Sequence, residues 1–129
     1  MNAVTLVQAW HDALNAGDFG RLAALSRPDI ELVGPRGSAF GREVLREWGT
    51  RAGLSLTPQA VFARDHVVVV AQRGVWRDAD SGEVVGEADV ASVFRVEDSL
   101  VSFLARHDHL EAALEQAGLT AADRHPHRL

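Results

Sequence analysis

The sequence contains no lysine, cysteine or tyrosine, and each absence excludes a kind of chemistry. Without lysine there is no Schiff base and no phosphate-loop lysine. Without cysteine there is no thiolate nucleophile, disulfide bond or zinc–thiolate site. Without tyrosine, no phenol can act as a proton donor. Acid–base chemistry must therefore come from histidine, aspartate, glutamate or a polarised water molecule, with arginine as the only fixed cation.

Clustered positive charge and long apolar runs are missing as well. The net charge is −5, and the 13 basic residues, all arginine, form no run of the kind that tracks nucleic-acid phosphates. No stretch approaches the roughly 20 apolar residues of a membrane span. The start, Met1-Asn2-Ala3-Val4, lacks the basic flank and apolar run of a signal peptide. We therefore expect a cytoplasmic protein that has neither a nucleic acid nor a membrane as its partner.

The length and composition fit one domain. The chain has 129 residues, of which 47% are hydrophobic and 24% are charged. This is enough apolar material for one core, but the chain is too short for two full-sized domains. We predict a single domain over residues 1–119 and a frayed tail over residues 120–129.

Apolar residues at three- and four-residue spacing predict four helices. Gly17 ends the first helix, and Asp18 can cap the second. Asp108, three residues before Glu111, predicts the N-cap of the last helix, which stops at Gly118. The predicted helices span residues 3–16, 19–25, 42–52 and 110–117.

Between the last two helices the apolar period changes to two, which is typical of β-strands. Asp98-Ser99 is interpreted as a two-residue turn, and a polar loop over residues 78–83 joins the preceding pair of strands. An earlier, brief strand is followed by a turn-rich loop over residues 34–38. The predicted strands span residues 30–33, 54–64, 66–76, 84–96 and 100–107. This order predicts an α+β fold with helices packed against one antiparallel sheet.

Four short motifs follow one another along nearly the whole chain. They are Asn15-Ala16-Gly17-Asp18, Leu22-Ala23-Ala24-Leu25, Gly41-Arg42-Glu43 and Ser92-Val93-Phe94-Arg95-Val96-Glu97-Asp98. In this order and spacing they resemble the nuclear transport factor 2-like (NTF2-like) superfamily, specifically its SnoaL-like branch. The resemblance implies a cone-shaped fold, in which helices pack on a curved antiparallel β-sheet that encloses a pocket. It also implies a homodimer formed through the outer face of the sheet.

The same resemblance argues against one activity of the superfamily. Ketosteroid isomerases of this fold use an aspartate base before a proline, a tyrosine on the first helix and an acid on the penultimate strand. The matching positions here are Gly34, Trp10 and Ser92, and none carries the required group. We therefore expect no ketosteroid isomerase activity. SnoaL-type polyketide cyclases have an acid/base residue beside the last strand, and His107-Asp108 lies in that region.

The hairpin turns predict which side chains share the interior face of the sheet. Counting back from Asp98-Ser99 places Phe94 opposite Phe103 and Val90 opposite His107. The preceding hairpin places Arg73 opposite Val90, near His107. The predicted pocket consists of Trp10, Arg73, Val90, Ser92, Phe94, Phe103 and His107.

His107 is the candidate catalytic residue, because histidine titrates near neutral pH and can act as a general acid or base. The structural alternative is a cavity-edge histidine bonded to backbone. Arg73 could hold a ligand carboxylate or pair with Glu87 or another acid. His107 and His109 could form a metal site completed by His11 or an acid, but the start of the last helix turns His109 away. We expect neither a metal nor another cofactor.

Three functions remain open from the sequence. The first is a bacterial protein whose apolar pocket holds a small hydrophobic molecule. The second is a proton-transfer enzyme of the polyketide cyclase, isomerase or hydrolase type that uses His107, with Ser92 and Arg73 placing the substrate. The third is a structural dimerisation module.

A homodimer is also predicted from an apolar patch on the outer face of the sheet, which is too large to stay exposed. Its predicted members are Val68, Val70, Trp76, Ala91, Val93 and Leu104, surrounded by Gln72, Asp89, Arg95 and Arg106.

Overall fold

The computed structural model describes residues 2–34 and 36–126. In this part of the chain the elements are α1 (Ala3–Ala16), α2 (Phe19–Ala24), β1 (Ser26–Gly34), β2 (Gly37–Phe40), α3 (Arg42–Ala52), β3 (Leu54–Arg64), β4 (Val67–Arg77), β5 (Val84–Glu97), β6 (Leu100–His107), α4 (Leu110–Ala117) and the 3-10 helix η1 (Ala121–Asp123). The predicted helices are all present. The four strands of the meander match their predicted bounds within one residue. Among the described residues, no helix is both long and apolar enough to cross a membrane.

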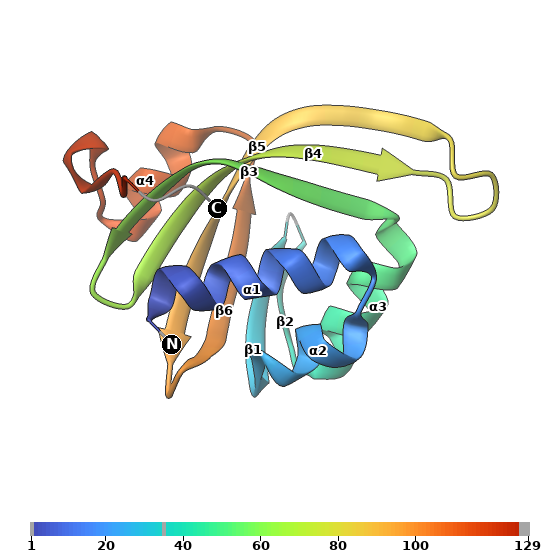
Figure 1. The fold of residues 1–129 in the computed structure, drawn as a ribbon, viewed down its shortest axis with the longest axis horizontal. Coiled ribbons are helices and arrows are strands. Elements are labelled where there is room, and N and C mark those ends of the chain that lie inside the picture. Colours follow the sequence, from blue (N-terminus) through green and yellow to red (C-terminus); the bar gives the residue numbers. More distant parts are fainter. Residues whose placement is uncertain (1, 35, 127–129) are drawn as a thin grey trace.

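The six strands form one curved sheet in the order β2-β1-β6-β5-β4-β3 (Figure 1). The α+β class is confirmed. However, β1 runs parallel to β6, so the prediction of a purely antiparallel sheet is wrong at this one pairing. β2 was expected to be part of a turn-rich loop. It forms an edge strand because the glycine-rich segment closes a hairpin in which Gly34 pairs with Gly37 and Leu32 pairs with Ala39.

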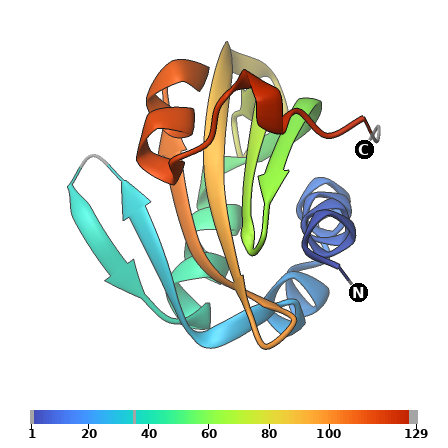
Figure 2. The same ribbon diagram turned by 90° about the vertical axis from the view of Figure 1, so that its left-hand side faces the viewer.

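The two faces of the sheet are covered by different helices (Figure 2). On the inner face, α1, α2 and α3 pack over a core that includes Trp10, Leu45 and Phe94. On the outer face, α4 covers a smaller core that includes Val69 and Ala113. Full burial of a large apolar side chain contributes about 1.5–3 kcal/mol. Because β4 and β5 are covered on both sides, consecutive residues of these strands are buried.

This double cover removes the apolar patch that predicted a homodimer. Val68, Val70, Trp76 and Leu104 belong to the inner core or pack against it. Only Ala91 and Val93 lie on the outer face, where α4 buries both of them. The predicted patch therefore does not exist as one exposed surface, although this finding leaves the oligomeric state itself untested.

Local sequence signals explain where the first two helices begin and end. The Asn2 side chain accepts a hydrogen bond from the Thr5 backbone N–H (2.8 Å), and Asp18 does the same for Arg21 (3.1 Å). Gly17 ends α1 in the left-handed conformation, with a φ of 71°. The predicted cap of α4 is wrong. Its N-cap is His109, without a side-chain cap bond, because the helix begins one residue too late for Asp108 to reach its first turn.

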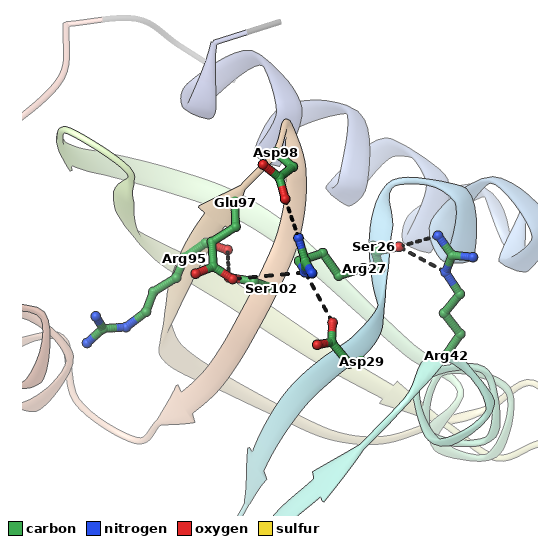
Figure 3. A network of polar contacts seen from close by, with 8 residues as sticks. All are labelled: Ser26, Arg27, Asp29, Arg42, Arg95, Glu97, Asp98 and Ser102. Atoms are coloured by element: carbon green, nitrogen blue, oxygen red, sulfur yellow. Dashed lines mark hydrogen bonds and ion pairs between the residues drawn. The ribbon is translucent and has the colours of Figure 1, made fainter.

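Two arginines tie the start of β1 to its surroundings, as Figure 3 shows. Arg42, at the start of α3, donates from Nε and Nη2 to the carbonyl oxygen of Ser26 over 2.9 and 2.7 Å. Arg27 donates to Asp98 in the β5–β6 turn (2.6 Å) and to Asp29 (3.1 Å). The first clamp fixes the beginning of α3 against β1. The second fixes β1 against the hairpin that carries β6.

The C-terminal segment is attached to the sheet as far as the structure describes it. Thr120 and Asp123 form a capping box around η1, Arg124 bridges to Phe62, and the His125 backbone N–H donates to the carbonyl oxygen of Val61 (2.7 Å). Residues 120–125 therefore differ from the frayed tail expected from the sequence. Residues 127–129 lie outside the described part of the chain.

Candidate functional site

A β-bulge decides which residues of β5 and β6 share a face. The strands pair as predicted next to the turn, but the register shifts between Arg95 and Val96. Beyond this shift His107 pairs with Ala91, and Phe103 pairs with Arg95. His107 and Phe103 therefore lie on the outer face of the sheet, and their predicted interior positions are wrong.

Arg73 lies on the outer face as well, because it pairs with Asp89 and not with Val90. Its guanidinium is 3.3 Å from the carboxylate of Asp89 and 3.5 Å from that of Glu87. The predicted pocket position of Arg73 is thus wrong, and the alternative, an ion pair with a neighbouring acid, is confirmed. Ion pairs this exposed contribute about 0–1 kcal/mol to stability.

Val90, Ser92 and Phe94 do lie on the inner face of the sheet, with Trp10 of α1 beside them, but all four are packed into the core. Trp10, Val90, Ser92 and Phe94 have exposed fractions of 0%, 5%, 1% and 0%. The Trp10 ring meets the Phe94 ring edge to face, with 5.2 Å between centroids. The indole N–H of Trp10 donates to the Ser26 hydroxyl (3.3 Å). The centre of the cone is therefore filled by side chains at these positions.

A buried chain of polar groups runs through this filled centre. The Ser92 hydroxyl donates to Oε1 of Gln72 (2.8 Å), and Nε2 of Gln72 lies 2.7 Å from Nε2 of His11. On the other side of the ring, Nδ1 of His11 lies 2.8 Å from the carbonyl oxygen of Val7. A carbonyl oxygen can only accept, so Nδ1 carries the proton and Nε2 accepts from Gln72.

The hydrogen bond that Gln72 donates to Nε2 holds His11 in its neutral form. Burial lowers the pKa of His11 to about 4, against the smaller opposing effects of the Val7 carbonyl and the charge of Asp12. The pairing of His11 with Gln72 differs from the expectation that Gln72 lies on the outer face. The sequence does contain a signal that His11 is buried, because it lies between Trp10 and Ala13 in the apolar stripe of α1.

A groove of about 690 Å³ lies beside the packed centre, between α3, the β1–β2 hairpin and the end of β6. Val44 and Trp48, one turn apart on α3, face it from one side. Leu32 and Leu104, which pair across β1 and β6, face it from the sheet. Its polar lining residues are Arg36, Arg106, His107, Asp108 and Gln116. Trp48 connects the groove to the core, since its ring centroid is 6.4 Å from that of Trp10.

His107 contributes to the rim of this groove from the outer side of the sheet. Its Nε2 atom is hydrogen-bonded to Oε1 of Gln116 on α4. An amide oxygen accepts, so in the neutral ring the proton is on Nε2 and the lone pair is on Nδ1. Nδ1 makes no hydrogen bond to a described residue.

The comparisons with known proteins agree with this fold. The family model described as "SnoaL-like domain" matches residues 7–103. The chain belongs to the SnoaL-like family. A search of curated proteins found no significant match.

Solved structures with the same fold share little sequence with this SnoaL-like chain. An NTF2-like protein of unknown function from Cytophaga hutchinsonii has a TM-score of 0.73 at 14% identity, covering 87% of this chain and 94% of that one. A putative polyketide cyclase from Xanthomonas campestris pv. campestris has a TM-score of 0.70 at 22% identity, covering 89% and 96%. A Mycobacterium tuberculosis protein in complex with estradiol-17β-hemisuccinate has a TM-score of 0.71 at 18% identity, covering 84% and 95%. These likenesses establish the NTF2-like fold.

Three positions of this SnoaL-like chain were expected to match the catalytic residues of ketosteroid isomerases. Gly34 lines the groove and carries no side chain that could abstract a proton. Trp10 and Ser92 are buried in the core and bonded to Ser26 and Gln72. The chemistry of the residues at these positions thus gives no support to that reaction.

Two other features lack the properties of a functional site. A cavity of about 640 Å³ near the N-terminus of α1 includes Arg27, which is already paired with Asp29 and Asp98. Within the described residues, no group of three or more histidine, aspartate or glutamate side chains is arranged to hold a metal ion. The groove is therefore the best candidate for a functional site.

Proposed function

We propose that this protein binds a small, largely hydrophobic organic molecule in the groove beneath α3. The observation that carries the proposal is a 690 Å³ space bordered by the apolar side chains of Leu32, Val44, Trp48 and Leu104. Ligand sites of proteins commonly have volumes of about 300–1,000 Å³ and combine apolar walls with a few polar groups. The polar residues at the rim of the groove supply these polar groups.

The rigid attachment of α3, which forms one wall of the groove, also supports the proposal. α3 is fixed against β1 by the two hydrogen bonds from Arg42 to Ser26, so Val44 and Trp48 are held in place before a ligand arrives. Two structural neighbours add support, since one is titled a putative polyketide cyclase and another was solved with estradiol-17β-hemisuccinate.

The test is a heteronuclear NMR titration with the neutral aromatic probe 2-naphthamide. We expect the largest changes in NMR chemical shift at the indole N–H of Trp48 and at the methyl groups of Val44 and Leu104. Ala39→Trp, which fills the groove from β2, should abolish these changes. Ser38→Trp, on the neighbouring residue that is outside the groove lining, should keep them. Shifts confined to the outer face of the sheet would contradict the proposal.

A second candidate function is proton transfer by His107. The observation that favours it is the bond from Nε2 to Gln116, which leaves the basic Nδ1 without a described partner at the rim of the groove. His107 would act as a general base towards a bound substrate with an acidic C–H group. The test is deuterium exchange into such a probe, for example 2-indanone. His107→Gln should reduce the catalysed exchange at least tenfold, while the exposed-residue control His66→Gln should not.

A homodimer through the part of the outer face that α4 leaves uncovered remains a proposal. It is supported by half-buried Val75 on β4 and by Val85, which is 68% exposed at the start of β5. A cytoplasmic location likewise remains a prediction from the sequence.

A further inference from the structure

Arg106 is a cation of the groove that has no counter-ion among the residues the structure describes. It pairs with Ser92 across β5 and β6, so it lies on the inner face and not on the outer face where the sequence analysis assigned it. It lines the groove, its side chain is exposed, and it has no hydrogen bond or ion pair with a described residue. The arginines Arg27 and Arg73, in contrast, each pair with two carboxylates at 3.5 Å or less.

The position of Arg106 is supported by an aromatic ring. Its Cζ atom lies over the ring of Trp76, 5.4 Å from the centroid. Trp76 occupies the space above Gly74, where an added Cβ atom would come within 2.9 Å of the indole. Gly86 lies opposite Trp76 on β5, and its Cβ position would be 3.8 Å from the same ring. Two glycines thus make room for the ring against which the guanidinium rests.

The charge around Arg106 favours an anion. Arg36 also lines the groove and has no hydrogen bond or ion pair with a described residue. The carboxylate of the described lining, Asp108, is exposed and forms no ion pair with either arginine. Two guanidinium groups that have no ion-pair partner within the described part of the chain therefore border an apolar groove, in a protein whose net charge is −5.

We propose that the ligand of the groove is an organic anion, whose carboxylate binds Arg106 while its apolar body lies between Trp48 and Leu104. This inference rests on the proposed function and specifies its ligand class. A guanidinium presents its N–H donors in a planar fork that matches the two oxygens of a carboxylate. The contact with Trp76 holds the guanidinium in place, so less side-chain freedom is lost on binding.

The experiment compares two probes of nearly equal size and shape, 2-naphthoate and 2-naphthamide, by isothermal titration calorimetry at neutral pH. We expect the wild-type protein to bind the carboxylate about tenfold more tightly than the amide. Arg106→Gln should reduce this preference to less than threefold and leave the affinity for the amide nearly unchanged. Arg106→Lys, which keeps the charge but loses the fork, should give an intermediate preference.

Arg73→Gln is the matched control, because it removes the same charge from the outer face of the same sheet. It should retain the full preference for the carboxylate, and circular dichroism should show that all variants fold. Equal binding of both probes to the wild-type protein, or an unchanged preference in Arg106→Gln, would overturn the inference while leaving the proposed function intact. If neither probe binds at millimolar concentration, both the inference and the proposed function fail.

Discussion

The Nε2 atom of Gln72 lies 2.7 Å from the Nε2 atom of His11, at the end of a line of donors that begins with the Ser92 hydroxyl. All three side chains are at most 1% exposed. Every polar atom in the line has a partner, and the direction of the donors leaves no place for a second proton on His11. These three polar side chains are thus fully bonded within an otherwise apolar core, and the open space lies in the groove beside it.

Acidification is expected to destabilise the protein through His11. Its pKa is about 4 in the folded protein, below the ordinary value of 6.5, so the unfolded chain binds more protons between these two values. This contribution to the free energy of unfolding is fully present above about pH 6.5 and falls as the pH drops towards about 4. The gap corresponds to about 3 kcal/mol.

Urea unfolding across this pH range measures the effect. The loss of stability on acidification should be smaller in His11→Gln than in the wild-type protein. His66→Gln changes an exposed histidine and should show the wild-type loss. Identical pH profiles for all three proteins would mean that His11 does not titrate as described.

Gln72→Leu is expected to lower stability without changing the fold. The variant removes the donor to His11 and the acceptor for Ser92, and each buried group left without a partner costs about 1–3 kcal/mol. Gln59→Leu, at an exposed position of β3, should change stability by less than about 0.5 kcal/mol. Chemical denaturation of both variants measures their free energies of unfolding. Equal values for the two variants would contradict the role of the buried hydrogen bonds among Ser92, Gln72 and His11.

Alanine substitutions at Gly53 and Gly82 distinguish the cost of backbone strain from the cost of a steric clash. Both have positive φ angles, 52° and 72°. Alanine at either position must therefore adopt a left-handed backbone conformation, which lowers stability by about 1–2 kcal/mol. At Gly53 a Cβ atom would also lie 2.3 Å from the carbonyl oxygen of Arg77, whereas at Gly82 it would meet nothing within 4 Å. Gly53→Ala should therefore lower the thermal midpoint far more than Gly82→Ala. Similar midpoints would show that the α3–β3 connection can move away from β4.

The sequence predicted the elements better than the faces they present. The three- and four-residue spacing of apolar residues predicted α1 and α3. The turn at Asp98-Ser99 also forms as expected, with φ angles of 53° and 61° at these two residues. The β-bulge after Arg95 then moves every following residue of β6 to the other face. Alternation could not reveal this shift, because β5 is buried on both faces from Val90 to Phe94.

The candidate site was predicted only in part because two separate register differences changed the faces of its arginines. In the β4–β5 hairpin, Arg73 pairs with Asp89 instead of Val90 and lies on the outer face. In the β5–β6 hairpin, the bulge after Arg95 moves Arg106 to the inner face. Val44 and Trp48 follow the apolar spacing that predicts a helix over residues 42–52, but the groove they border depends on β2 and on the parallel pairing of β1 with β6. No local pattern encodes a pairing between strands so far apart in the chain.

Light scattering tests the proposed homodimer. At micromolar concentration we expect twice the chain mass of 14.0 kDa. Val85→Asp places a charge on the exposed apolar part of β5 and should shift the population towards the monomer. The exposed control Val84→Asp tests whether any charge on this strand has the same effect. A monomer of the wild-type protein would contradict the proposal.

A crystal structure of the protein grown with 2-naphthoate tests the proposed anion site most directly. We expect a flat ring system between Trp48 and Leu104, with its carboxylate at the guanidinium of Arg106. Density for the ring system only in the cavity beside Arg27, or only on the outer face of the sheet, would contradict this expectation.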